Sequence, residues 1–144
     1  MRHVVLLGDS IFANAAYTSG APDVVSHLRR LLPAGWEATL SAVDGATTAE
    51  LASQLRRVPQ DASHLVISIG GNDILRNRDL LSLRVTSSAQ ASDAFAARVT
   101  AFQRAYRGRI EKAVMLQPAG ALGWRPPAPL GGADVAGFQM SGAP

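Results

Sequence analysis

The segment His3-Val4-Val5-Leu6-Leu7-Gly8-Asp9-Ser10 is an apolar run that stops abruptly in a glycine, an acid and a hydroxyl. Its apolar residues do not alternate with polar ones, which is typical of a strand covered by helices on both faces. Ser10 is therefore expected at the carboxyl end of a buried central strand, where open α/β sheets bind ligands. Gly8 permits a tight exit from that strand. A serine held there can be a nucleophile if one group removes its proton and others stabilise the resulting oxyanion.

The size and composition of the chain are typical of one soluble globular domain. The sequence has 144 residues, enough for a single core, and 47% of them are hydrophobic. No apolar run approaches the ~20 residues that a membrane span needs, and the amino-terminal run is shorter than that of a secretory leader. We therefore expect a cytoplasmic protein. The sequence has no cysteine, which excludes disulfides and thiolate metal sites.

The positive charge is concentrated in the carboxyl-terminal third of the chain. Residues 1–97 carry 8 basic residues against 9 acids, whereas residues 98–144 carry 6 against 2. A nucleic-acid interface would interleave such basic residues with stacking aromatic side chains, as Arg104, Tyr106 and Arg107 could. A solvated face of an arginine-rich helix explains the same residues and is favoured. We expect no nucleic-acid partner.

Strand-like and helix-like segments alternate along the chain. The expected strands are residues 4–7, 36–43, 64–69 and 113–116, and the expected helices are residues 22–32, 47–58 and 92–107. The second helix opens with a capping box at Thr47 and Glu50, the first has Pro22 at its first position, and Gly108 is expected to end the third. Residues 11–20 read as a loop with one short helical turn, and residues 74–88 as a surface loop or short helix.

This pattern predicts an α/β fold: a three-layer α/β/α sandwich with a parallel, flavodoxin-like sheet in the order 2-1-3-4. The domain is expected to cover residues 1–117. Residues 118–144 are rich in proline, glycine and alanine and are expected to form a loosely ordered tail. The abrupt change in composition after about residue 116 suggests a sheet truncated at its carboxyl-terminal end, as in a shortened or frame-shifted gene.

The three histidines do not form an obvious site. Asp61 and His64 resemble an acid–histidine pair, but His64 begins the third strand and lies roughly 17 Å from Asn72 beyond its other end. A hydrogen bond at the strand entry is expected for His64, and His27 is expected at the boundary of its helix. With the histidines scattered and no glycine-rich phosphate loop followed by lysine, we expect no metal and no organic cofactor.

Three strand ends are expected to meet at the carboxyl edge of the sheet. They carry Ser10, Gly45 and Asn72. The backbone N–H groups of Ser10 and Gly45 and the side-chain amide of Asn72 could hold the negative charge that develops on a carbonyl oxygen. Each such donor is typically worth roughly 3–4 kcal/mol in the transition state.

These blocks resemble the SGNH hydrolases, also called the GDSL esterase/lipase family. Gly8-Asp9-Ser10 resembles the first block of that family, Gly45 its glycine block, and Gly70-Gly71-Asn72-Asp73 its G-x-N-D block. The resemblance covers about residues 3–116. It implies that Ser10 is the nucleophile and that Gly45 and Asn72 complete an oxyanion hole. For Asp9 and Asp73 we expect structural roles, in which they hold turns through backbone hydrogen bonds.

The sequence departs from the family in its last block, an Asp followed three residues later by the His that acts as base. Here Asp134 is followed by Gly137, and no histidine occurs after His64. Without an imidazole, Ser10 is a weak nucleophile, although an oxyanion hole and binding alone leave a residual ~10³–10⁴-fold acceleration over water in a triad enzyme.

Three functions remain open from the sequence. The first is a serine ester hydrolase that acts on small acyl or acetyl esters through an acyl-enzyme at Ser10, with activity impaired by the missing histidine. The second is an inactive or fragmentary family member that only binds acyl or carbohydrate ligands. The third is a nucleic-acid-binding module that uses the basic segment 98–109. The expected partner is a small-molecule ester, with no membrane; the sequence gives neither the ester nor the oligomeric state.

Overall fold

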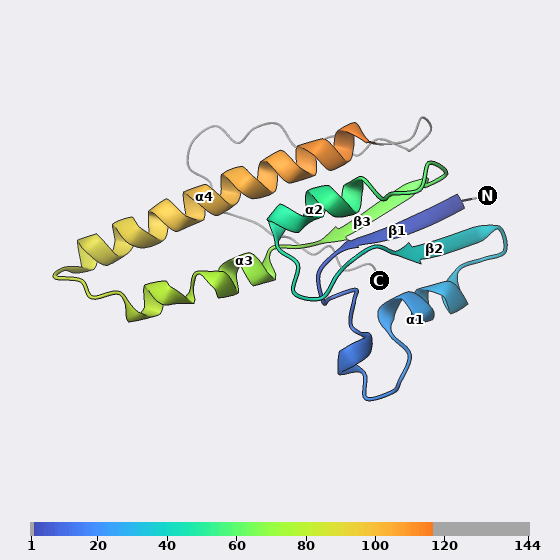
Figure 1. Ribbon diagram of the computed structural model, residues 1–144, viewed down its shortest axis with the longest axis horizontal. Helices are drawn as coiled ribbons and strands as arrows, with labels where there is room; N and C mark the ends of the chain where they lie inside the picture. The colour runs from blue at the N-terminus through green and yellow to red at the C-terminus, as the bar shows by residue number, and fades with distance from the viewer. Residues whose placement is uncertain (1, 117–144) are drawn as a thin grey trace, which may run out of the picture.

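The computed structural model describes residues 2–116, so the predicted tail at 118–144 lies outside the described residues. A three-stranded sheet forms its centre, with strands β1 (Arg2–Gly8), β2 (Trp36–Leu40) and β3 (His64–Ser68) (Figure 1). The strand order is β2-β1-β3 and both pairings are parallel. The apolar run at the amino terminus is thus the central strand, and the predicted order of the first three strands is confirmed.

Successive side chains of β1 point into two separate cores. Val5 and Leu7 face α2 (Thr48–Leu55), and Val4 and Leu6 face α1 (Val24–Leu31). All four are nearly inaccessible to solvent, as expected for a strand that helices cover on both sides. The fold is therefore the predicted α/β/α sandwich.

The helix starts follow from side-chain caps. Asp23 caps α1, because its carboxylate accepts a hydrogen bond from Ser26 N at 2.9 Å. Pro22 consequently precedes the cap instead of occupying the predicted first helical position. The predicted capping box of α2 is present: Thr47 N donates to Glu50 Oε2 at 2.7 Å, and the Thr47 hydroxyl donates to the same oxygen.

The second strand ends three residues earlier than predicted. The N–H groups of Ser41 and Ala42 both donate to Leu6 O, at 2.8 and 2.9 Å. Two consecutive amides that share one carbonyl interrupt the regular ladder, so residues 41–43 follow β1 as irregular chain. Short helical turns occupy the predicted loops: η1 (Ala15–Tyr17), α3 (Gly71–Arg76) and η2 (Arg78–Ser82).

The predicted fourth strand at residues 113–116 is wrong. A single helix, α4 (Ser88–Met115), continues through Gly108, where a stop was predicted. An interior glycine costs a helix only about 1 kcal/mol, and tertiary packing offsets it here. Ala113 is buried in the core against α2. Periodicity cannot distinguish a strand from a buried helical turn in so short an apolar run.

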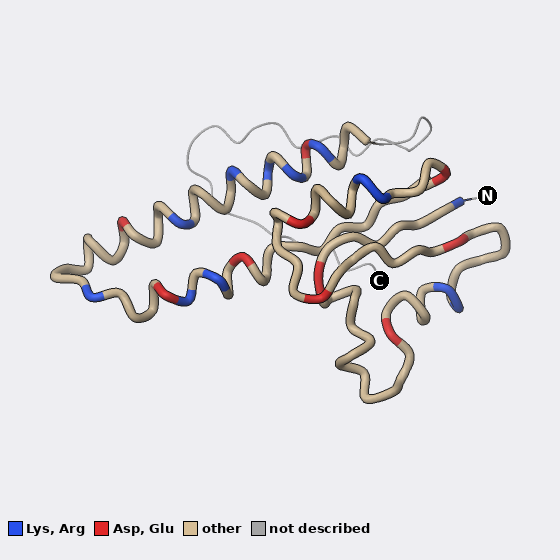
Figure 2. Tube along the Cα trace, viewed as in Figure 1, with Lys and Arg blue, Asp and Glu red and all other residues tan. Residues whose placement is uncertain are grey.

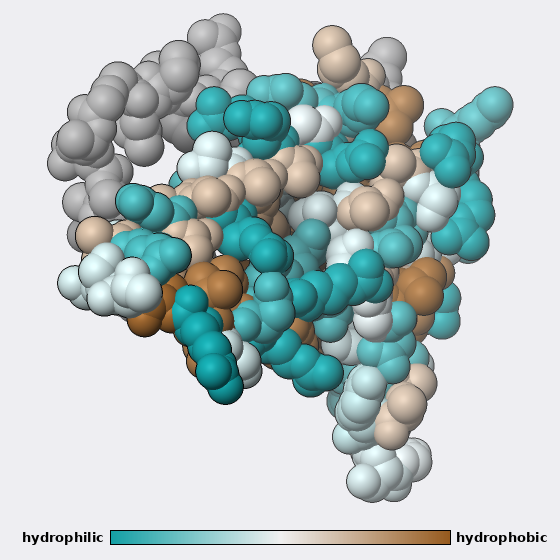
Figure 3. All heavy atoms as spheres, turned by 60° about the vertical axis from the view of Figure 1, so that its left-hand side comes forward, coloured by the Kyte–Doolittle hydropathy of each residue, from teal (hydrophilic) through white to brown (hydrophobic). Residues whose placement is uncertain are grey.

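The first half of α4 runs beside α3 and η2, and together they form an arm that extends away from the sheet (Figure 1). Arg98 joins the two sides of the arm through Asp79, at 3.0 Å, and Asn77, at 2.6 Å. The basic residues between positions 98 and 112 lie along α4 (Figure 2). Apolar side chains gather on the surface of the arm (Figure 3). The exposed large ones include Ile74, Leu75, Leu81, Leu83, Val85, Phe95 and Val99. Between residues 2 and 116, no helix is both long and apolar enough to cross a bilayer.

Candidate active site

The turn that carries Ser10 requires glycine at position 8. Gly8 has a φ of 130°, and a Cβ there would lie 1.7 Å from Ser68 O. Asp9 N donates to the same Ser68 carbonyl at 3.0 Å. The close approach of β1 to β3 therefore excludes every side chain at position 8 and fixes where the chain leaves the sheet.

The side-chain amide of Gln54 holds this turn from α2. Gly8 N donates to Gln54 Oε1 at 2.7 Å, and Gln54 Nε2 donates to Gly8 O at 2.8 Å. Gln54 is fully buried. Gln54 is not among the residues predicted from the sequence, although a glutamine within the apolar stripe of Leu51 and Leu55 is a recognisable signal, because a buried amide needs partners.

Asp9 has the structural role predicted for it. Its carboxylate is buried and accepts a hydrogen bond from Ile11 N at 3.1 Å, while its carbonyl accepts from Phe12 N and Ala13 N. These bonds form the tight turn around Ser10, whose own side chain is half-buried. Ser10 thus lies on a constrained turn beyond the carboxyl end of the central strand.

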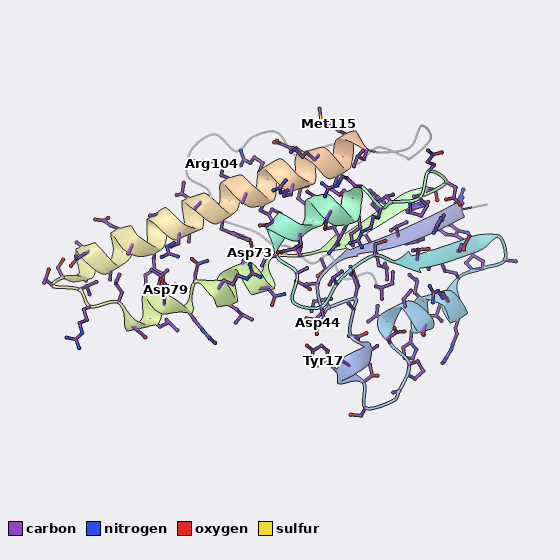
Figure 4. The ribbon with its side chains drawn as sticks, viewed as in Figure 1. Tyr17, Asp44, Asp73, Asp79, Arg104 and Met115 are labelled. Carbon is purple, nitrogen blue, oxygen red and sulfur yellow. The ribbon has the colours of Figure 1, made fainter. Side chains whose placement is uncertain are left out.

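The turn that contains Gly45 lies against the turn that carries Ser10. Val43 N donates to Gly8 O at 3.0 Å, and Gly45 adopts a φ of 75°. On the outer side, Tyr17 OH donates to Asp44 Oδ2 at 2.7 Å (Figure 4). This hydrogen bond and the negative charge of Asp44 raise the pKa of Tyr17. The Gly45 turn is therefore joined to the end of β1 on one side and to the loop after Ser10 on the other.

The block at residues 70–73 joins the same edge. Gly70 has a φ of 121°, and a Cβ there would lie 3.1 Å from the Phe102 ring of α4. Asn72 Nδ2 donates to Ala46 O at 2.9 Å, which places the Asn72 amide beside the Gly45 turn. Asp73 accepts from Thr48 N at 2.9 Å and from Thr48 Oγ1 at 2.7 Å, so it anchors this block to the start of α2 as predicted.

These contacts bring the blocks of Ser10, Gly45 and Asn72 together at the carboxyl edge of the sheet. The Asn72 amide has two N–H groups, and the bond to Ala46 uses one of them. The other N–H therefore remains for a further acceptor at this edge.

The three histidines lie away from Ser10. His64 begins β3, and its Nδ1 lies 2.8 Å from Ser63 Oγ, which is the predicted hydrogen bond at the strand entry. The His64 ring also packs on Trp36. His27 is exposed on α1. His3 lies at the amino-terminal end of β1, and Asp61 contacts its Nδ1 at 3.2 Å. Asp61 therefore pairs with His3 and not with His64.

Comparison with protein-family models matches residues 6–138 to the GDSL-like Lipase/Acylhydrolase family. The match includes Ser10, Gly45 and Asn72, and it extends over Asp134 and Gly137. No curated protein sequence matches the chain significantly. The family match supports a general esterase or acylhydrolase function. With nearly the whole sequence covered, this chain belongs to the GDSL-like lipase/acylhydrolase family.

Proposed function

We propose that the chain is a serine ester hydrolase that acts on small acyl or acetyl esters through an acyl-enzyme at Ser10. One observation carries this proposal: hydrogen bonds connect the turn of Ser10 to the turn of Gly45, and that turn to Asn72. Family membership supports the reaction class.

In the proposed reaction, Ser10 Oγ attacks the ester carbonyl carbon and the carbonyl electrons move onto its oxygen. The N–H groups of Ser10 and Gly45 and the second N–H of Asn72 bind this oxyanion, each contributing roughly 3–4 kcal/mol. The tetrahedral intermediate collapses, the alcohol leaves with a proton, and the acyl group stays on Ser10. Water then attacks the acyl-enzyme, releases the acid and restores the serine.

Proton removal from Ser10 is the slow part of this scheme. All three histidines lie elsewhere in the fold, so the proposal gives the serine proton to solvent and not to an imidazole. The proposed turnover is therefore low and rises with hydroxide concentration, with the remaining acceleration coming from the oxyanion donors.

The test compares p-nitrophenyl acetate hydrolysis by the wild type and by Ser10→Ala, together with the mass of each protein after exposure to a fluorophosphonate. Ser92→Ala, an exposed serine on α4, is the matched control. We expect turnover and one covalent label in the wild type and in Ser92→Ala, and neither in Ser10→Ala. Equal hydrolysis and labelling in all three proteins would refute the proposal.

A second function is favoured by the replacement of the family's final histidine, since Gly137 stands three residues after Asp134. On this alternative, the same edge of the sheet binds acyl or carbohydrate groups without turning them over. Saturable binding of a short-chain ester, with no label and no Ser10-dependent hydrolysis, would favour the binding role.

A further inference from the structure

A second cluster of chemically active side chains lies at the opposite, amino-terminal end of the sheet. His3 comes from β1, Glu37 from β2 and Asp61 from the loop before β3. One ligand atom from each residue lies within 4.8 Å of the others. His3 and Glu37 are register neighbours, which places their side chains on the same face of the sheet.

Backbone contacts hold the third member of the cluster in place. Ser63 N donates to His3 O at 2.8 Å, and His3 N donates to Ser63 Oγ at 2.7 Å. Asp61 lies two residues before this reciprocal pair, so its carboxylate is brought to the His3 ring. The cluster therefore rests on the sheet and not on a free surface loop.

His3 is oriented as a metal-binding histidine is. It is 95% buried, and its Nε2 lies 2.8 Å from Thr39 Oγ1. Its Nδ1 is buried without a hydrogen bond, and the nearest charged atom is Asp61 Oδ1, 3.2 Å away. When Nε2–H donates to Thr39, Nδ1 carries a lone pair that no protein hydrogen bond uses, close to the two carboxylates. In metal sites, the ring nitrogen that does not bind the metal typically donates to an oxygen in this way.

We propose that His3 Nδ1, Glu37 and Asp61 bind one divalent transition-metal cation, with Zn²⁺ as the best fit. Imidazole nitrogen together with carboxylate oxygen suits Zn²⁺, and the two carboxylates balance its charge. Mg²⁺ and Ca²⁺ prefer oxygen ligands alone and are disfavoured by the imidazole.

The distances allow such a site to close. Bonds of about 2.1 Å in tetrahedral geometry put ligand atoms roughly 3.4 Å apart. Glu37 and Asp61 are exposed, and the Asp61 side chain is 64% accessible, so carboxylate rotation alone can bring their oxygens inward. The bound ion would join β1, β2 and the loop before β3. It would stabilise the fold at the end remote from Ser10 and take no part in ester chemistry.

A simple ion pair between His3 and Asp61 is the alternative, and Glu37 distinguishes the two. The ion pair does not need Glu37, whereas the metal site does. The Glu37→Gln and Asp61→Asn substitutions keep side-chain size and lie on the surface, so the fold is expected to survive them.

The experiment titrates the chelator-treated full chain with ZnCl2, and separately with MgCl2, by isothermal calorimetry. We compare the wild type, Glu37→Gln, the double variant Glu37→Gln/Asp61→Asn and the control His27→Gln/Asp93→Asn, whose residues are exposed and remote. We expect saturable 1:1 Zn²⁺ binding to the wild type and the control, at least ~10-fold weaker binding to both site variants, and no Mg²⁺ binding. Far-UV circular dichroism checks that each variant is folded.

The ¹⁵N resonances of the His3 imidazole provide a second measurement. They would not respond to Zn²⁺ if His3 and Asp61 formed only a structural ion pair. On addition of Zn²⁺, we expect the Nδ1 resonance of His3 to shift while Nε2 stays protonated toward Thr39. Equal Zn²⁺ affinity in the wild type and the double variant, or a His3 ring that Zn²⁺ leaves unchanged, would overturn the proposal. Binding retained in Glu37→Gln but lost in the double variant would also do so, because it would reduce the cluster to a His3–Asp61 pair.

Discussion

The side-chain amide of Gln54 pairs with both the N–H and the C=O of Gly8, at 2.7 and 2.8 Å, two residues before Ser10. Gln54 is fully buried, so these bonds lie in a low-dielectric environment in which an unpaired partner is costly. Helix α2 therefore positions the turn of the central strand through one amide. This relationship makes Gln54 the residue through which α2 holds the turn of Ser10.

Replacing Gln54 with leucine removes both hydrogen bonds at nearly constant volume. Val43 N still donates to Gly8 O, but Gly8 N–H loses its partner. We expect a loss of about 1–3 kcal/mol in the free energy of unfolding, the cost of one unsatisfied buried donor. Urea denaturation measures it, with Gln103→Leu on the exposed face of α4 as the control. Equal stability of the two variants would contradict a role for the Gln54–Gly8 contact.

Gly8→Ala is expected to prevent folding. The new methyl carbon would lie 1.7 Å from a backbone oxygen, which no side-chain adjustment relieves. The expected destabilisation exceeds about 4 kcal/mol. Gly20→Ala is the matched control: Gly20 also has a positive φ, 87°, but no atom lies within 4 Å of its Cβ position. Its cost is therefore only about 1–2 kcal/mol. Expression and circular dichroism of the two variants check this difference, and a folded Gly8→Ala protein would contradict it.

Asp73 and Asp79 offer a comparison of two aspartates on neighbouring turns (Figure 4). Asp73 accepts two hydrogen bonds from Thr48, whereas Asp79 forms an exposed pair with Arg98. Asp73→Asn is expected to cost about 1–3 kcal/mol in the free energy of unfolding. The amide has only one acceptor oxygen, whereas the two donors of Thr48 bond the two different oxygens of the carboxylate. Asp79→Asn is expected to cost at most about 1 kcal/mol. Thermal unfolding distinguishes them, and the reverse order would refute the anchoring role of Asp73.

The central strand and the turns at its carboxyl end could be predicted because local sequence determines them. A non-alternating apolar run specifies burial on both faces, a glycine after it permits a tight exit from the strand, and Thr47 with Glu50 caps a helix without tertiary help. With the strand order expected of a flavodoxin-like fold, they bring the three blocks to one edge. The family resemblance added the possible role of each block, which local pattern alone does not supply.

Contacts between distant segments could not be predicted in the same way. Residues 113–116 were predicted to form a strand, but Ala113 belongs to helix α4 and packs on α2. Packing in the core, and not local propensity, determines the conformation of this segment. The pairing of Gln54 with Gly8 joins residues 46 positions apart. The cluster of His3, Glu37 and Asp61 arises from the register of β1 with β2 and from the path of the loop before β3, neither of which a local sequence pattern shows.

Acid should weaken the fold through two helix caps. Hydrogen bonds from the Ser26 side chain, and to a smaller extent from its backbone N–H, lower the pKa of Asp23 from its ordinary value of 3.8. Hydrogen bonds from the Thr47 side chain, and to a smaller extent from its backbone N–H, lower the pKa of Glu50 from 4.5. A pKa that is lower in the folded state means that the ionised carboxylate stabilises the fold. This stabilisation is complete above the ordinary values and is lost as the pH falls through the folded pKa.

The urea midpoint of the wild type should therefore fall between pH 6 and pH 2. In Asp23→Asn/Glu50→Gln, the midpoint at pH 6 should be lower, and its further fall on acidification should be smaller. Titration of the midpoint against pH in both proteins measures the difference. Parallel curves for the two proteins would show that other groups carry the acid sensitivity.

Asn72→Ala tests whether its second N–H stabilises a developing oxyanion. If it does, the rate of labelling by a fluorophosphonate should fall by about 10²-fold, because that reaction also places negative charge on an oxygen beside Ser10. Labelling requires only the first attack by Ser10 and no hydrolysis of the adduct, and both variants keep the same source of proton removal, so the ratio of their rates reports the oxyanion donors. The control is Asn77→Ala. Asn77 lies at the end of α3, and its side-chain amide donates to Asp73 O and does not contact the Gly45 turn. Because Asn72 also bonds Ala46 O, urea stability is measured in parallel. A loss of labelling without a matching loss of stability assigns Asn72 to the oxyanion, whereas equal rates in both variants would remove it from the site.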